Sequence, residues 1–427
     1  CYLKIDNIFC VSRLTREGSG TFLTVLIDKI IKTSQKRGEE LLDEIISRVK
    51  GIDLNPIAAL TARVNYFINV ANYIDSNKQL EIPVYLGDSS YVPKEVLVDG
   101  VRCLQYTITT IKKPIDILVP ESMVENTSLF SSSMNNVETH IKNLDTDSVY
   151  NTFISLVAPE DLTETTRANL KDLAEQLVAL ESRKWNGVWA RIITNFLTTA
   201  NLGKFDIIVG NPPWVDWKSL PSGYRDKIKS LCISRNLFSG DVVTGGINLN
   251  ICALITNVAA QNWLSDKGII AFLMPEPLVF QQSYEGFRNL YMNDDERLFF
   301  YKFVNWNKAG HPFSPVTQKF LTYYIGHNEV DYSRGVSTIS YVKKVRNNID
   351  DIEVLDVECT FEKENNLLAT CHPEKNFFTY VDSEETANKY RKMSGESVYI
   401  GREGIEFYPQ ELMVFTVADV ETPKGLT

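Results

Sequence analysis

An amide, two prolines and an indole ring stand side by side at Asn211, Pro212, Pro213 and Trp214. The amide oxygen and the carbonyl of Pro212 are able to accept hydrogen bonds from an exocyclic amine, while the indole is able to stack on a flat ring. Consecutive prolines exclude a helix or a strand ladder, so the turn is rigid. This combination suits a planar substrate that carries an amino group, such as a nucleobase.

The same four residues also fit a plain structural interpretation, in which a strand ends in a tight turn and the tryptophan belongs to the core. The preceding residues give the turn its place. Phe205 to Val209 is an apolar, β-branched run, typical of a central strand in a parallel sheet, and Gly210 lets the backbone turn. We therefore expect the turn at the carboxyl end of a strand, where ligands bind in open α/β sheets.

A glycine loop near the start of the chain is a second candidate for ligand binding. Gly18, Ser19, Gly20 and Thr21 lead into a run with helical apolar spacing. Glycines at a helix N-terminus let a ligand approach the backbone closely, although such loops are also common as simple turns. A buried strand is expected before this loop, but the residues from Val11 to Glu17 do not resemble one.

Two acidic residues follow short predicted strands. Asp53 ends the strand at 51–53, at a distance from the glycine loop that is typical of a carboxylate binding ribose hydroxyls. Asp88 follows the strand at 82–86 and is able to accept a hydrogen bond from an adenine amine. Each residue also has a structural interpretation, as a helix N-cap for Asp53 and as a turn residue for Asp88.

The order of the predicted elements indicates an α/β protein with a doubly wound, mostly parallel sheet. Strands are predicted at 51–53, 82–86, 205–209, 269–274, 298–304 and 319–326, with helices at 39–50, 248–264 and 285–291 among them. Residues 91–200 are predicted to be an insertion, with strands between 96 and 119, a polar loop at 131–136 and helices over 160–200. From about residue 330, short β-like runs alternate with polar stretches, including runs at 352–357 and 398–400, and this change of pattern predicts a second domain.

The composition of the whole chain excludes several classes. The net charge of −10 argues against a general coat of basic residues for nucleic acid, but leaves room for a local basic cleft after the turn. That cleft would involve Lys218, Arg225, Lys227, Lys229 and Arg235. Seven scattered cysteines suit a reducing compartment, and four dispersed histidines predict no metal site. No apolar run is long enough to cross a membrane, and the first residues suggest that the chain begins inside a longer protein.

Taken in order, the glycine loop, Asp53, Gly87-Asp88 and Asn211 to Trp214 resemble the motifs of S-adenosyl-L-methionine-dependent DNA adenine-N6 methyltransferases of the gamma class. Residues 203–217 and 401–409 are similar to segments of large methylases from restriction-modification and phage-defence systems. The resemblance covers roughly residues 15–325. It implies a Rossmann-like methyltransferase fold, double-stranded DNA as the partner and a cytoplasmic location in a prokaryotic cell.

The resemblance implies roles for the cofactor residues. Residues 18–21 would lie against the methionine part of S-adenosyl-L-methionine, Asp53 would bind its ribose, and Asp88 would accept from its adenine amine. One departure affects this assignment: the family has an acidic residue and a proline shortly before the glycines, where this chain has Leu14 to Glu17. A degenerate loop that binds cofactor poorly is therefore an alternative.

The resemblance also implies that Asn211 and the Pro212 carbonyl accept from the N6 amine of a flipped-out target adenine, with Trp214 stacked on the base. Residues 1–329 would form the catalytic domain and 330–427 the incomplete start of a target-recognition domain. Two alternatives stay open. Protein-glutamine and RNA-guanine methyltransferases share the Asn-Pro-Pro-aromatic turn, and a non-catalytic DNA-binding subunit would retain the fold without cofactor.

Overall fold

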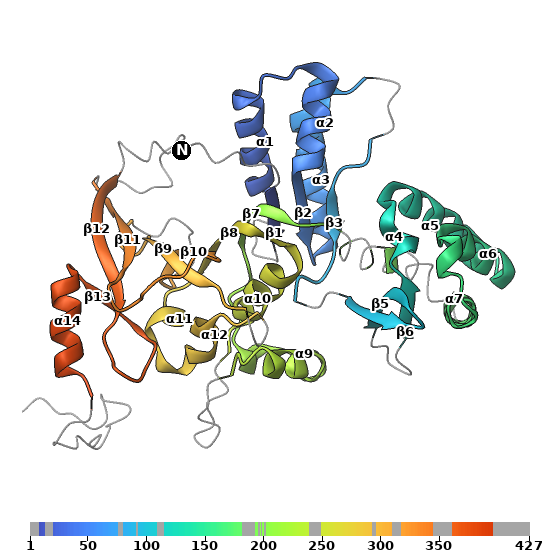
Figure 1. Cartoon of the computed structure of the whole chain (residues 1–427). Helices are drawn as coiled ribbons and strands as arrows, with labels where there is room; N and C mark the ends of the chain where they lie inside the picture. The colour runs from blue at the N-terminus through green and yellow to red at the C-terminus, as the bar shows by residue number, and fades with distance from the viewer. Residues whose placement is uncertain are drawn as a thin grey trace, which may run out of the picture.

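The computed structural model describes residues 8–12, 20–75, 80–90, 93–108, 115–181, 193–194, 197, 199, 202–238, 249–292, 296–309, 317–344 and 361–395. They form a ten-stranded sheet with associated helices, and a three-stranded sheet that carries helices of its own (Figure 1). The fold is mixed α/β, which confirms the predicted α/β class, whereas the predicted mostly parallel sheet is not found, because four of the strand pairs in the large sheet are antiparallel.

The large sheet has the order β13-β12-β11-β9-β10-β8-β7-β1-β2-β3. Its strands are β1 (Ile8–Ser12), β2 (Val49–Asp53), β3 (Val84–Leu86), β7 (Phe205–Asn211), β8 (Leu264–Pro275), β9 (Phe299–Asn305), β10 (Phe320–Gly326), β11 (Val336–Lys343), β12 (Phe361–Thr370) and β13 (Phe378–Val381). Neighbours from β3 to β8 are parallel, and β10 is antiparallel to both β8 and β9. The sheet is therefore mixed, and the predicted Pro-Pro turn follows a strand of its parallel half.

Strand β1 corrects the expectation that no buried strand precedes the glycine loop. It pairs in parallel with β2 on one side and with β7 on the other, so it is an interior strand of the parallel half. The apolar run from Ile8 to Val11 lies further from the glycines than expected. The mainly polar residues from Ser12 to Glu17 separate this run from the glycines, so no strand was predicted directly before the loop.

Helices cover both faces of the parallel half. They are α1 (Thr21–Thr33), α2 (Gly38–Arg48), α3 (Pro56–Val70) with the short η1 (Ala71–Tyr73), and α10 (Ile251–Trp263). Val209 packs in the core with α1, α2 and α3, whereas the adjacent Ile208 belongs to the core that contains α10. Since successive strand residues point to opposite faces, these helices lie on opposite sides of the sheet.

Local signals fix where α3 begins. The Asn55 side chain caps the helix by accepting from the backbone N–H groups of Ile57 and Ala58, and Pro56 occupies the first turn. The helix therefore starts directly after β2, and the end of β2 is held in a short turn. Asn55, and not Asp53, is the N-cap residue.

The insertion is an independent core beside the large sheet (Figure 1). It contains β4 (Lys94–Val98), β5 (Val101–Ile108), β6 (Ile115–Pro120), α4 (Ser122–Glu125), α5 (Thr127–Lys142), α6 (Thr146–Leu156), η2 (Pro159–Asp161) and α7 (Glu164–Glu181). The predicted polar loop at 131–136 is wrong, because these residues belong to α5. Phe130, Met134 and Val137 are buried at helical spacing, and Asn126 caps the helix.

The antiparallel half continues the sheet beyond residue 330. Strand β11 pairs in parallel with β9, and β12 and β13 follow, with α14 (Glu384–Met393) packed against them. The assignment of 330–427 to target recognition stays a prediction. The β-like runs at 352–357 and 398–400 and the segment at 401–409 lie outside the described residues.

The remaining described helices lie between β7 and β9 in sequence. They are η3 (Trp217–Ser219), α9 (Ser222–Ser234), α11 (Pro277–Phe280), η4 (Gln282–Tyr284) and α12 (Glu285–Asn289). Within the described parts of the chain, no helix has the length and apolar character needed to cross a membrane.

Candidate active site

Strand register places Asp53 and Asn211 at the same edge of the sheet. Ser12 of β1 pairs with Asp53 on β2 and with Asn211 on β7. Paired residues of neighbouring strands project to the same face, and adjacent strands lie about 4.8 Å apart, so the two Cα atoms are about 10 Å apart across β1. Both side chains therefore belong to the face covered by α1 and α3, at the carboxyl ends of their strands.

Asn211 has an unused hydrogen-bond acceptor. Its Oδ1 atom is buried, and the described part of the chain offers it no hydrogen-bond donor. Pro212 and Pro213, which follow Asn211 in the sequence, are both buried. A buried carbonyl without a donor costs about 1–3 kcal/mol, so this oxygen is available for a ligand that brings an N–H group.

A hydrogen bond and a ring contact hold the Trp214 indole in place. Its Nε1 atom donates to the backbone oxygen of Leu273 at 3.1 Å, and its ring lies 5.5 Å from the ring of Phe320, tilted by 36°. The tryptophan is half-buried beside Asn211, so part of the indole remains available to a ligand. The sequence analysis missed Phe320, because nothing local distinguishes it within the predicted strand at 319–326.

Asp53 is 4% exposed and serves a structural turn. Its Oδ1 atom accepts from the Asn55 N–H at 2.7 Å, and its backbone oxygen accepts from the Gly87 N–H at 3.0 Å. The second contact brings the end of β3 against the end of β2. The turn therefore holds the Asp53 carboxylate at the carboxyl end of β2.

Asp88 is 5% exposed and lies next to this junction. Its Oδ1 atom accepts from the Ser90 N–H at 3.0 Å and from Ser90 Oγ at 2.6 Å. The Tyr224 hydroxyl of α9 lies 3.3 Å from Oδ2. Ser90 and Tyr224 were not identified from the sequence, although Tyr224 directly precedes Arg225 of the predicted basic cleft.

The glycines around this edge leave no room for side chains. Gly20 caps α1 with a φ of +77°, and a Cβ atom there would lie 2.9 Å from Ala62 Cβ on α3. A Cβ atom at Gly87 would lie 2.7 Å from Thr199 Cγ2. Thr21 is exposed in the first turn of α1, while Gly18 and Ser19 lie outside the described residues.

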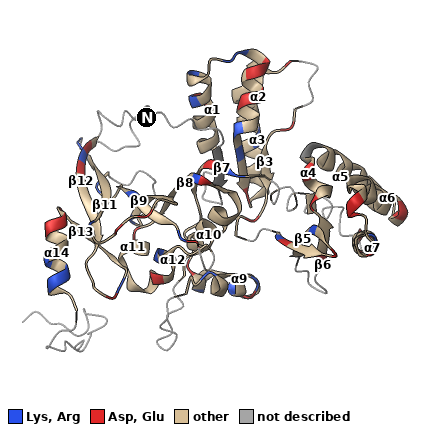
Figure 2. Cartoon of the chain, viewed as in Figure 1, with Lys and Arg blue, Asp and Glu red and all other residues tan. Residues whose placement is uncertain are grey.

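The basic residues of the predicted cleft lie in η3, along α9 and directly after it, and Figure 2 shows the basic positions on α9. Lys218 and Lys229 are exposed. Lys227 instead donates to the hydroxyl of Tyr106 at 3.4 Å, and Arg235 donates to Gln261, so these two side chains bind within the protein. The predicted basic cleft therefore loses two of its members to internal contacts.

Comparison with known families gives the class of the protein. Residues 47–308, more than half of the chain, match the model of the Eco57I restriction-modification methylase. The match includes Asp53, Asp88 and the Asn-Pro-Pro-Trp turn. The chain belongs to the Eco57I restriction-modification methylase family.

Solved structures give weaker similarities. The ATP-dependent Type ISP restriction-modification enzyme LlaBIII bound to DNA is 13% identical, with 79% of this chain and 18% of that chain covered and a TM-score of 0.37. A modification subunit of a putative type I restriction enzyme from Vibrio vulnificus YJ016 is 10% identical, with 89% and 56% covered and a TM-score of 0.39. The chain thus spans less than two thirds of either protein. No curated protein matches the sequence.

Proposed function

We propose that this chain transfers a methyl group from S-adenosyl-L-methionine to the N6 amine of a flipped-out adenine in duplex DNA. The reaction would serve a restriction-modification or phage-defence system in a prokaryotic cytoplasm. The family match supports DNA methylation in such a system. The choice of adenine and of this cofactor comes from the residues of the site.

One observation carries the choice of an amine substrate. Asn211 Oδ1 is a buried acceptor to which no described residue donates, at the carboxyl end of β7 and across β1 from Asp53. Adenine N6 brings N–H donors, and the amide oxygen and the Pro212 carbonyl would accept from them. Trp214 stands beside the amide with its indole anchored, as stacking on a base requires.

The residues present also fit a nucleoside cofactor. Two buried carboxylates, Asp53 and Asp88, lie at the ends of neighbouring strands and are able to accept from a ribose hydroxyl and an adenine amine. S-adenosyl-L-methionine supplies a methyl group activated by the sulfonium charge. The proposal includes a doubly wound, Rossmann-like arrangement of the parallel half, supported by helices on both faces and by the reversal of strand order at β1.

The chemistry depends on positioning. The lone pair of adenine N6 is delocalised into the ring, which makes the nitrogen a poor nucleophile. Acceptors at Asn211 and Pro212 would favour a pyramidal nitrogen and direct its lone pair, which is catalysis by orientation and preorganised dipoles. Base flipping costs a few kcal/mol, and contact with the Trp214 ring would recover part of that cost.

The test is methyl transfer to defined DNA. The chain is incubated with tritiated S-adenosyl-L-methionine and a pool of unmethylated duplexes, and the labelled nucleosides are identified after digestion. We expect the label on N6-methyladenine. Label on RNA or protein alone would favour the guanine or glutamine alternative, and a chain that fails to bind cofactor by calorimetry would favour a non-catalytic DNA-binding subunit.

A further inference from the structure

Helix α9 touches the candidate cofactor site from the substrate side. The chain leaves the Asn-Pro-Pro-Trp turn, passes through η3 and enters α9 at Ser222. The first turn of α9 carries Tyr224, whose hydroxyl lies 3.3 Å from Asp88 Oδ2 and 3.5 Å from Oδ1. A residue that follows the base-binding turn thus contacts the carboxylate assigned to the cofactor.

Two hydroxyl groups gather around the Asp88 carboxylate. Ser90 Oγ lies 2.6 Å from Asp88 Oδ1 and donates to it. The Tyr224 hydroxyl is in close contact with Ser90 Oγ and within reach of Asp88 Oδ2. Because each hydroxyl has a single proton, Tyr224 donates either to the carboxylate or to the serine that already serves it.

These contacts leave one acceptor position on the carboxylate. Of about four lone-pair positions, the Ser90 N–H and the Ser90 hydroxyl use two on Oδ1, and the tyrosine uses at most one on Oδ2. The hydrogen bonds also fix the plane of a side chain that is 5% exposed. The remaining position therefore has a defined direction, as recognition of one exocyclic amine requires.

The next turn of α9 fastens the helix to the insertion. Lys227 Nζ donates to the Tyr106 hydroxyl of β5 at 3.4 Å and lies 5.3 Å from the centre of that ring. Burial lowers the pKa of the Lys227 ammonium, and the nearby Asp88 carboxylate opposes that change. Tyr224 and Lys227 are three residues apart and share a face of α9, so the contact with Tyr106 holds the helix in place close to Tyr224.

We propose that Tyr224, together with Ser90, positions the Asp88 carboxylate so that it selects a cofactor whose purine carries a 6-amino group. The inference rests on the proposed cofactor role of Asp88 and adds a positioning residue from α9. It assigns Tyr224 to cofactor selection, whereas the neighbouring Arg225 and Lys227 were expected to belong to a basic cleft for nucleic acid.

The experiment measures binding of two ligands by calorimetry, without turnover. One is S-adenosylhomocysteine, and the other is the same compound with the 6-amino group of its purine replaced by hydrogen. The variants are Tyr224→Phe and Ser90→Ala. Tyr390→Phe, an exposed tyrosine on α14, is the control. Thermal unfolding is recorded for each variant.

We expect Tyr224→Phe and Ser90→Ala to weaken binding of S-adenosylhomocysteine about threefold to tenfold, the effect of one hydrogen bond near a charge. The affinity for the deamino ligand should change less than twofold, because this ligand has no 6-amino group to donate a hydrogen bond to the Asp88 carboxylate. Equal losses for both ligands would overturn the positioning role while leaving the proposed function intact. Failure of the unaltered chain to bind S-adenosylhomocysteine would overturn both.

Discussion

At the scale of single residues, Asn211 has a buried hydrogen-bond acceptor that no described residue uses. Its amide oxygen is buried, and no donor among the described residues reaches it, while the two following prolines keep the backbone in place. Side chains that served only the fold would be expected to find a donor. The unused acceptor is therefore the residue-level feature that most directly indicates a bound amine.

Replacing Asn211 by alanine should separate activity from stability. We expect Asn211→Ala to lower kcat about 10²–10³-fold, the effect of removing one preorganised dipole, with cofactor affinity changed little. The melting temperature should not fall, because the substitution removes a buried polar atom that lacks a donor. Steady-state kinetics and calorimetry measure these effects. Asn388→Ala on α14 is the control, and unchanged turnover in Asn211→Ala would refute the assigned role.

The backbone at Gly20 should not tolerate a side chain. Gly20→Ala adds a Cβ atom 2.9 Å from Ala62 Cβ and 3.0 Å from its Cα, at a φ of +77°. Gly38→Ala shares the left-handed φ, at +54°, but no described atom lies within 4 Å of its added Cβ. Both variants have the backbone strain, and only the first has the collision.

We expect Gly20→Ala to lower the free energy of unfolding by about 1–3 kcal/mol more than Gly38→Ala, as for other overpacked positions. Urea titration of both variants measures the difference. Equal losses would mean that α1 shifts away from α3 at little cost. The close approach of Gly20 to Ala62 would then not be required for stability.

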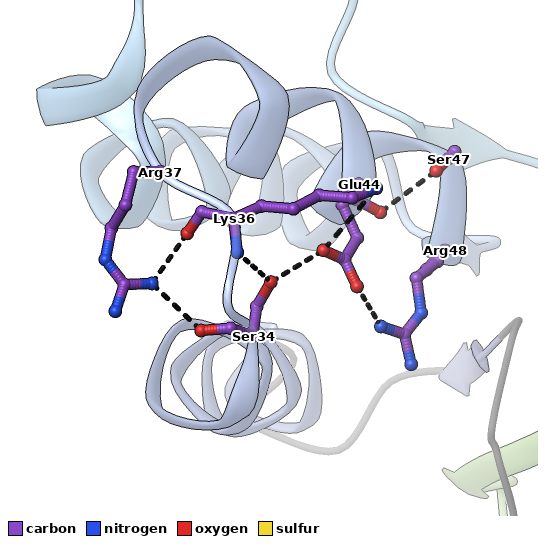
Figure 3. Close-up of polar contacts among 6 residues, drawn as sticks. All are labelled: Ser34, Lys36, Arg37, Glu44, Ser47 and Arg48. Carbon is purple, nitrogen blue, oxygen red and sulfur yellow. Dashed lines mark hydrogen bonds and ion pairs between the residues drawn. The ribbon is translucent and has the colours of Figure 1, made fainter.

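At the scale of elements, the junction between α1 and α2 is held by Glu44 (Figure 3). Its carboxylate accepts from Ser34 Oγ at 2.7 Å and from Arg48, with Lys36 Nζ at 3.8 Å. The Ser34 hydrogen bond is the main cause of the lowered pKa of Glu44. Burial acts in the opposite direction and raises the pKa, while Arg48 lowers it further. The ionised carboxylate therefore ties the end of α1 to the middle of α2.

The contribution of Glu44 should disappear in acid. Its pKa in the folded chain lies below the usual 4.5, so the stabilisation is present above pH 4.5 and is lost as the pH falls through the lower, folded value. We expect Glu44→Gln to lower the melting temperature by a few degrees at pH 7, and by less and less below pH 4.5. Glu175→Gln, exposed on α7, is the control. A melting-temperature difference that does not depend on pH would contradict this account.

At the scale of the whole molecule, an aromatic cluster joins β9, β10 and α12 to the outer strand β13. Phe300 of β9 lies within 5.4–6.0 Å, between ring centres, of five other rings. These are Phe287, Phe303, Tyr323, Tyr332 and Phe378. They come from α12, β9, β10, the turn before β11, and β13, so the core integrates segments far apart in sequence.

Truncation at the centre of this cluster should be costly. We expect Phe300→Ala to lower the free energy of unfolding by about 3–5 kcal/mol, since the ring is fully buried and leaves a cavity. Phe22→Ala on α1, where the ring is 37% exposed, is the matched control. Chemical denaturation compares the two, and similar losses would show that the cluster does not govern the stability of the sheet.

Much of the local structure follows from patterns in the sequence. Runs of apolar, β-branched residues give β7 and β8, and Asn55 and Pro56 give the start of α3. The misreadings also have local causes. Polar and charged neighbours conceal β1, and the serines and asparagines between Phe130 and Val137 resemble a loop although the buried residues around them have helical spacing.

The sequence by itself determined that Asn211 and Asp53 end strands and that Asp88 follows one, because apolar runs, glycines and prolines act within a few residues. The tertiary structure alone decided which of these ends meet. Only the register of β1 sets Asp53 across from Asn211, only packing of α9 brings Tyr224 to Asp88, and only β10 brings Phe320 to Trp214. Such contacts depend on strand pairing and helix docking between segments distant in sequence, and no local pattern encodes them.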